Sequence, residues 1–375
     1  MAHAYTPGLK VLHETIIHKE RRLPLKGEVV VEQGKLVSPD DIVAKTDLPG
    51  NVQMVNVANQ LNIDAIDTPV AMIAKEGTHV KKGEMIAESK GIFGLFKSHA
   101  NAPADGTIEV ISDVTGQVVI REAPIPVEID AYMSGIIKSV IPEEGVTIES
   151  KGVFIQGIFG IGGESRGELA VIVENRDDEI TEQLITPDLK DKIIIGGSFI
   201  SLSAYKKAIQ MKVAGVVVGG FNYYDLEDIL GYTLGVAITG SEDLVTSLIV
   251  TEGYGKIRMG HRTFELLAEH QGKFASVNGA TQIRAGVIRP EIVIPLKTDE
   301  ITGRHKDVHA SEGIQPGSLV RVIRAPYFGR LGRVVELPAE LRKMESETMV
   351  RVAIIEIDKE QYEIPRANLE MVETD

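Results

Sequence analysis

The stretch Gly77-Thr-His-Val80-Lys-Lys-Gly83-Glu-Met-Ile86-Ala87 decides how the first third of the chain folds, because an earlier stretch repeats its spacing. The recurring positions are Gly34, Val37, Val43 and Ala44 in the first copy and Gly77, Val80, Ile86 and Ala87 in the second. In each copy an apolar strand meets a glycine turn, and polar residues then lead into a second apolar pair. Repeated short strands with glycine turns favour a small β-barrel or sandwich.

A second pattern follows the first along the chain. Its recurring positions are Ala102, Gly106 and Ile108, and then Ala131, Gly135 and Ile137. The stretch 80–88 followed by 102–108 resembles the two half-motifs of the barrel-sandwich hybrid family, which includes biotinyl and lipoyl carrier domains. Similar segments occur in subunits of membrane redox pumps and in the largest bacterial RNA polymerase subunit. The resemblance covers about residues 23–150 and implies a fold rather than a function.

Carrier domains of that family hold the modified lysine at the tip of a hairpin between the half-motifs. Here this place is taken by 89–101, and Lys90 lies nearest to the expected position. The segment is longer than a carrier hairpin and lacks the flanking methionines or preceding aspartate. We therefore expect no cofactor on Lys90 or Lys97. The apolar loop residues, which we expect to pack on a neighbour or a partner, are Phe93, Leu95 and Phe96.

The middle of the chain alternates buried strands with helical spacing. Strands are predicted over 192–199, 214–221, 235–239 and 244–251, and helices over 202–212, 225–230 and 259–270. Such alternation is typical of an α/β domain with at least one βαβ unit.

Glycine loops follow the predicted strands of this middle region. Since ligands bind at strand ends in α/β domains, Gly197, Gly220, Gly240 and Glu242 are candidates for one small-molecule site. Glycine at a strand end is also common for packing alone.

Two further patterns invite a catalytic or metal interpretation. Gly163-Glu-Ser165-Arg-Gly167 has the spacing of a nucleophile elbow, but a strand follows it where that motif needs a helix. The pair His305 and His309 has helical spacing in a polar linker. We interpret both as structural or solvated, and we expect no catalytic residue and no metal.

The C-terminal stretch Pro316–Val335 resembles the KOW motif, which marks SH3-like barrels in ribosomal proteins and transcription elongation factors. Basic residues outnumber acidic ones from Gly303 to Lys343. The candidate partner-binding residues here are Arg321, Arg324, Tyr327, Phe328, Arg330 and Arg333. Arginines beside aromatic rings suit RNA, whereas a solvated or protein-binding face is the alternative.

Composition limits the classes of function that remain. The chain has 375 residues, a net charge of −14 and no cysteine, which removes disulfides and thiolate chemistry. A net negative charge works against non-specific binding to DNA or anionic membrane. With neither a signal segment nor an apolar run of membrane-spanning length, we expect a soluble, cytoplasmic protein.

The sequence therefore predicts a multidomain, mainly β protein. Its parts are a barrel-sandwich hybrid β-region over 1–151, an α/β domain over 152–296, a linker over 297–313 and a KOW-type SH3-like barrel over 314–375. The leading functional hypothesis is a non-catalytic scaffold or assembly protein that binds macromolecular partners and self-associates as a homo-oligomer. An RNA-, transcription- or translation-associated factor is the second hypothesis, and a small-molecule-binding protein that uses the glycine loops is the third.

Overall fold

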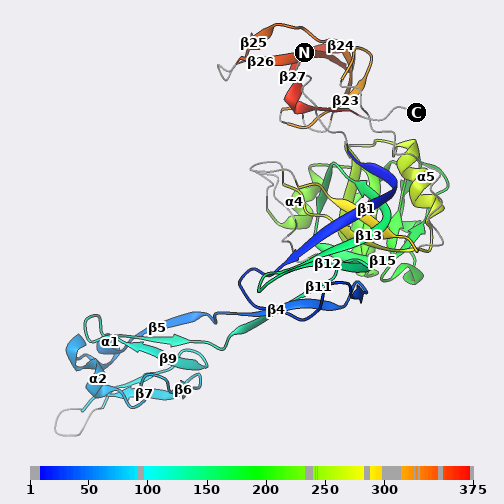
Figure 1. The fold of residues 1–375 in the computed structure, drawn as a ribbon. Helices are drawn as coiled ribbons and strands as arrows, with labels where there is room; N and C mark the ends of the chain where they lie inside the picture. The colour runs from blue at the N-terminus through cyan, green and yellow to red at the C-terminus, as the bar shows by residue number, and fades with distance from the viewer. Residues whose placement is uncertain are drawn as a thin grey trace.

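The computed structural model describes residues 9–90, 97–232, 240, 242, 244–282, 288–297, 314–324, 326–327, 330–344 and 349–371. Strands account for 47% of the protein and helices for 14%, so it is mainly β, as the sequence predicts. Several sheets are present, and Figure 1 shows them as a central body with smaller groups of strands at two ends. No helix among the described residues is long and apolar enough to cross a membrane.

One continuous sheet joins the N-terminal β-region to the middle of the chain. Its order is β14 (Phe159–Ile161), β20 (Ser247–Tyr254), β19 (Gly215–Phe221), β17 (Ile193–Ile195), β15 (Glu164–Val171), β21 (Phe274–Asn278), β22 (Glu291–Pro295), β13 (Gly145–Gln156), β12 (Gly135–Ile141) and β3 (Leu36–Val37). β1 (Val11–Arg22) pairs with β13 from end to end. Because β13 pairs with β12 through its first half and with β22 through its second, this one strand belongs to both regions.

Helices cover both faces of the parallel part of the sheet, where β17, β19 and β20 run in the same direction. The chain crosses between these strands through α3 (Leu202–Gln210) and α4 (Asp225–Leu230), which gives two βαβ crossovers. Alternate strand residues point to opposite faces. Ile194 therefore packs with α3 and α4, whereas Ile193 packs with α5 (His261–Glu269). Figure 1 shows α4 and α5 on opposite sides of the strands.

Helix and strand ends differ from the sequence expectations at a few points. The single strand expected over 192–199 is interrupted by glycines and becomes β17 and β18 (Phe199–Ile200), and β18 pairs with β16 (Glu179–Ile180). The strand expected over 244–251 begins and ends three residues later, as β20. The strand expected over 235–239 lies outside the described residues.

The repeated stretches of the N-terminal region form two units of β-structure. The proximal unit comprises β2 (Glu28–Val29), β3, β4 (Ile42–Leu48), β11 (Ile125–Asp130) and β12. The distal unit comprises β5 (Val52–Asn56), α1 (Val57–Leu61), η1 (Ala65–Asp67), α2 (Thr68–Ala71), β6 (His79–Val80), β7 (Met85–Glu88), β8 (His99–Asn101), β9 (Gly106–Ile111) and β10 (Gln117–Arg121). Each unit has its own apolar core.

The two units share local structure as well as spacing. In the proximal unit Val37 pairs with Gly135, and in the distal unit Val80 pairs with Gly106. The turn that follows β3 and the turn that follows β6 are closed in the same way. The Asp41 carboxylate accepts from the Ser38 backbone N at 2.7 Å, and the Glu84 carboxylate accepts from the Lys81 N at 2.8 Å. The predicted strand–turn–strand repeat is confirmed.

The distal unit is inserted into the proximal unit, between β4 and β11. In the proximal unit the connection between half-motifs is therefore not a tight hairpin but a complete second unit. Figure 1 shows the distal unit extending away from the central sheet, at the far end of the molecule from α5. Most of its surface is consequently turned towards solvent.

The C-terminal strands form a separate small sheet. Its order is β25 (Leu341–Lys343), β26 (Met349–Ile357), β24 (Leu331–Glu336), β23 (Leu319–Val322) and β28 (Leu369–Met371), and β27 (Glu360–Pro365) pairs with β26. Val320, Val322 and Val334 are buried in its core. Because alternate residues of a strand point to opposite faces, these valines share the inward face of the sheet.

Candidate functional site

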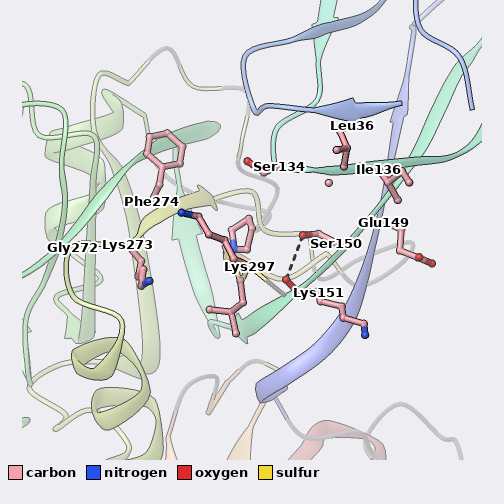
Figure 2. Close-up of a pocket in the computed structure, with 13 residues that line it drawn as sticks. Leu36, Ser134, Ile136, Glu149, Ser150, Lys151, Gly272, Lys273, Phe274 and Lys297 are labelled. Atoms are coloured by element: carbon pink, nitrogen blue, oxygen red, sulfur yellow. Dashed lines mark hydrogen bonds between the residues drawn. The ribbon is translucent and has the colours of Figure 1, made fainter. Parts of the chain in front are cut away.

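An open cleft of about 670 Å³ lies beside the central sheet, where β12 and β13 meet the start of β21 and the end of β22. Figure 2 shows its lining, which also includes Leu36 of β3. Pockets for small ligands are commonly about 300–1,000 Å³, so the volume is sufficient for a ligand or for several side chains of another protein.

Strand pairing places two exposed apolar side chains and one carboxylate side by side along one wall of the cleft. Leu36 pairs with Ile136, and Ile136 pairs in turn with Glu149. Because directly paired residues share one face of a sheet, these three side chains lie next to one another. Leu36 is 76% exposed, and Phe274 on the opposite wall is 43% exposed. The cleft therefore presents apolar side chains that nothing in the described structure covers.

The charges around the cleft are mainly positive. Lys151, Lys273 and Lys297 line it together with one carboxylate, Glu149. The Nζ atom of Lys138 lies 2.9 Å from the Glu149 carboxylate, and the Nε2 atom of His18 lies 2.9 Å from it. Hydrogen bonds from these two groups hold the pKa of Glu149 below its usual range. Glu149 is thus ionised at neutral pH and already paired with Lys138 and His18, which lie outside the lining.

The lining combines apolar side chains with three lysines and a single carboxylate, and it contains neither histidine nor cysteine. In Figure 2 the Lys297 ammonium extends towards the Phe274 ring. Apolar walls with cations at their rim favour an occupant that combines apolar and acidic groups.

The structure does not bring the predicted glycine-loop residues into one site. Gly197 and Gly220 lie together at the carboxyl ends of β17 and β19. An added Cβ would come within 2.6 Å of the Asn175 backbone oxygen at Gly197 and within 1.9 Å of the Gly255 oxygen at Gly220. Both glycines therefore allow close packing of backbone, which is the alternative that the sequence left open.

Gly240 and Glu242 lie at the opposite end of the same strands. The Glu242 carboxylate accepts hydrogen bonds from the backbone N of Gly240 at 2.6 Å and of Gly162 at 3.1 Å. Gly162 packs on Ser247 at the start of β20, whereas Gly220 pairs with Gly253 near its end. At about 3.3 Å per residue the two pairs are roughly 20 Å apart. The expected convergence of these loops is therefore wrong, and Glu242 joins two backbone segments.

Arg321 was expected on an exposed basic edge, and this expectation is wrong. Its side chain is buried, with Nη2 at 2.7 Å from the Glu252 carboxylate and Nη1 at 3.7 Å from that of Glu370. Arg289 also reaches Glu370, at 3.4 Å. Burial raises the pKa of Glu370 above its usual range. Alternation does place Arg321 opposite the core, but the central body covers that face of the C-terminal sheet.

The other arginines of the proposed basic edge are at the surface. Arg324 is exposed, Arg330 lies 3.6 Å from the Asp358 carboxylate, and Arg333 donates to the Gly317 backbone oxygen at 3.2 Å. Tyr327 packs its ring on Tyr362, with 4.7 Å between centroids. The other aromatic and apolar candidates, Phe328, Phe93, Leu95 and Phe96, lie outside the described residues.

Of two residues that the sequence motifs single out, Ser165 is buried in a strand and Lys90 is exposed. Ser165 lies within β15, paired with Val277, and its Oγ atom is buried, so no elbow presents it to a substrate. Lys90 is exposed next to β7. His305 and His309 lie outside the described residues, and no group of three or more metal-ligating side chains occurs in the described part of the chain.

Sequence reasoning missed a charged cluster around Tyr132. This residue is fully buried and has a left-handed backbone, with φ of 66°. Lys19 and Arg21 lie over its ring, 5.1 and 5.4 Å from the centroid. Arg21 also pairs with Asp130 and Glu164. Burial, together with nearby carboxylates, raises the Tyr132 pKa well above its usual value. The cluster joins β1, β11 and β15, so we interpret it as the joint between the proximal unit and the central body.

A scan against protein-family models found no matching family, and a search of curated proteins found no match. The fold defines the chain as a mainly β protein with several sheets.

Proposed function

We propose that this chain is a non-catalytic scaffold or assembly protein that binds macromolecular partners and associates with copies of itself. The observation that supports this most directly is the surface of the distal unit, which carries large apolar side chains without a described covering.

The apolar side chains gather on the helical segment of the distal unit and the neighbouring β9–β10 turn. Ile66 is 72% exposed, Val70 is 70% exposed and Val114 is 83% exposed. Ile66 and Val70 are four residues apart on consecutive helical turns and therefore share one side. A Cβ added to Gly116 of the turn would lie 3.4 Å from Ala65, so the turn lies beside the helical segment that carries Ile66. Contiguous exposed apolar residues mark interaction surfaces.

Acidic residues border these apolar side chains. Asp64 and Asp67 flank Ile66, and Asp113 precedes Val114. All three are exposed, and none of them forms an ion pair with another described residue. We call this surface, formed by Ile66, Val70 and Val114 with Asp64, Asp67 and Asp113, the distal patch. Its chemistry suits a partner surface that is apolar and basic.

Light scattering of the full chain and of the double variant Ile66→Ser, Val70→Ser tests this role. The wild type is expected to exceed the mass of one chain at micromolar concentration, and the variant to have a lower mass than the wild type. Exposed positions tolerate such changes, so circular dichroism should show unchanged folding. Equal masses for both proteins, each that of one chain, would refute self-association through the distal patch.

A second candidate function is RNA binding by the C-terminal sheet, which rests on its resemblance to the KOW motif. The exposed arginines Arg324, Arg330 and Arg333 favour it, because arginine at a surface is able to neutralise phosphates. The burial of Arg321 against two glutamates removes one of the expected cations from that surface. Titration with single-stranded RNA at two salt concentrations distinguishes this candidate from the first.

A further inference from the structure

The cleft and the distal patch have complementary chemistry, although they lie in different parts of the chain. The cleft has apolar walls, formed by Leu36 and Phe274 among others, and lysines at its rim. The distal patch has apolar side chains with aspartates at its rim. The rims of the two surfaces therefore carry opposite charges around apolar side chains. The chain's net charge of −14 makes copies repel one another overall, so a basic cleft is a favoured place for an acidic surface to dock.

The cleft and the distal patch lie in separate parts of one molecule. The cleft lies where the proximal unit meets β21 and β22, whereas Figure 1 shows the distal unit extending away from that body. The distal patch and the cleft of the same chain are thus not in contact. A contact between two different surfaces on two copies is heterologous, and it leads to rings or open chains of molecules rather than to a closed twofold dimer.

We propose that the cleft is the docking site for the distal patch of a second copy of this chain, an inference that rests on the proposed self-association. Ile66 and Val70 enter between Leu36 and Phe274, and the neighbouring aspartates approach the lysines of the rim. Lys151 is available for such a pair, because it forms no ion pair with another described residue. Salt weakens the association, since exposed charges are screened within about 8 Å at physiological ionic strength.

A charge-reversal experiment tests the docking. The cleft variant is Lys273→Glu with Lys297→Glu, and the patch variant is Asp64→Lys with Asp67→Lys. Each variant alone is expected to sediment close to the mass of one chain. An equal mixture is expected to assemble like the wild type, because the reversed cleft matches the reversed patch and the unmodified cleft of one variant matches the unmodified patch of the other. Lys190→Glu with Lys206→Glu makes the same charge change on other exposed lysines and should assemble like the wild type.

Leu36→Asp provides a second cleft variant that does not depend on the lysines. Its side chain is largely exposed, so the protein should fold normally and lose assembly. If the patch variant is monomeric while both cleft variants assemble like the wild type, the docking proposal is overturned and the scaffold role survives. A monomeric wild type overturns both. Cleft variants that assemble normally but no longer bind the probe 1-anilinonaphthalene-8-sulfonate would assign the cleft to a small anionic ligand and overturn the docking.

Discussion

Gly34 and Gly77 occupy equivalent places in two nested units. Their φ angles are 86° and 83°, and each donates its backbone N–H at 2.8 Å to an isoleucine carbonyl oxygen, that of Ile137 for Gly34 and that of Ile108 for Gly77. The acceptor isoleucines are equivalent too, since each is the second residue after a glycine that pairs with β3 in the proximal unit or with β6 in the distal unit. The repeat in the sequence is therefore a repeat in hydrogen bonding.

This equivalence predicts equal effects of the same change in both units. Gly34→Ala and Gly77→Ala should each lower the free energy of unfolding of their unit by about 1–2 kcal/mol, because a side chain disfavours a positive φ. Nothing lies within 4 Å of the added Cβ, so no clash is added. Urea unfolding followed by circular dichroism measures the loss. Lys35→Ala, next to Gly34, is the control and should change stability by less than about 0.5 kcal/mol.

Removal of Arg321 should loosen the C-terminal sheet from the central body. Arg321→Met leaves Glu252 buried without its cation and leaves Glu370 with Arg289 alone, and breaking a buried pair in this way costs about 3–5 kcal/mol. Hydrogen exchange should show early loss of protection in β23 and β28. Arg324→Met, three residues further on at an exposed position, should leave exchange unchanged. If the two variants behave alike, the buried cluster does not dock the sheet.

The tyrosines should ionise in two groups, because the buried ones need a higher pH than the exposed ones. Burial raises the pKa of Tyr132, Tyr205 and Tyr254. A folded pKa above the unfolded value of about 10 means that these tyrosines contribute stability below pH 10, and this stability is lost as the pH rises towards the folded value. Absorbance at 295 nm should show fewer than the nine tyrosines of the chain ionising before unfolding. Simultaneous ionisation of all nine with native circular dichroism would contradict the burial.

The C-terminal surface should reveal whether the second candidate function holds. If RNA binds there, Arg330→Glu with Arg333→Glu should weaken binding and reduce the salt slope by about one unit for each phosphate that is no longer neutralised. Fluorescence anisotropy with labelled single-stranded RNA at two salt concentrations measures both. A wild type without measurable RNA binding would leave these arginines as a solvated surface.

Local features of the fold could be predicted from the sequence. Which distant segment of the chain packs over a given residue could not. The helix 225–230 matches α4 residue for residue, and α3 begins at Leu202 as expected, capped by Ser201. Alternation along a strand places Val320 and Arg321 on opposite faces, but it says nothing about which other part of the chain covers the arginine. The same limit applies to Gly220, since a strand-end glycine looks identical whether a ligand or the Gly255 backbone approaches it.

The candidate site was missed for a related reason. Leu36 and Phe274 are far apart in the sequence and belong to short or ordinary strands, so no motif connects them. Ile66 and Val70 were overlooked because an isolated apolar pair at helical spacing ordinarily indicates a buried face. Only the structure reveals that this face is exposed.

Sedimentation equilibrium of the unmodified full chain, over a hundredfold range of concentration around the micromolar level, tests the proposed self-association most directly. We expect a mean mass above that of one chain, which rises with concentration and falls when salt is added. A mass equal to one chain at every concentration and salt level would contradict it.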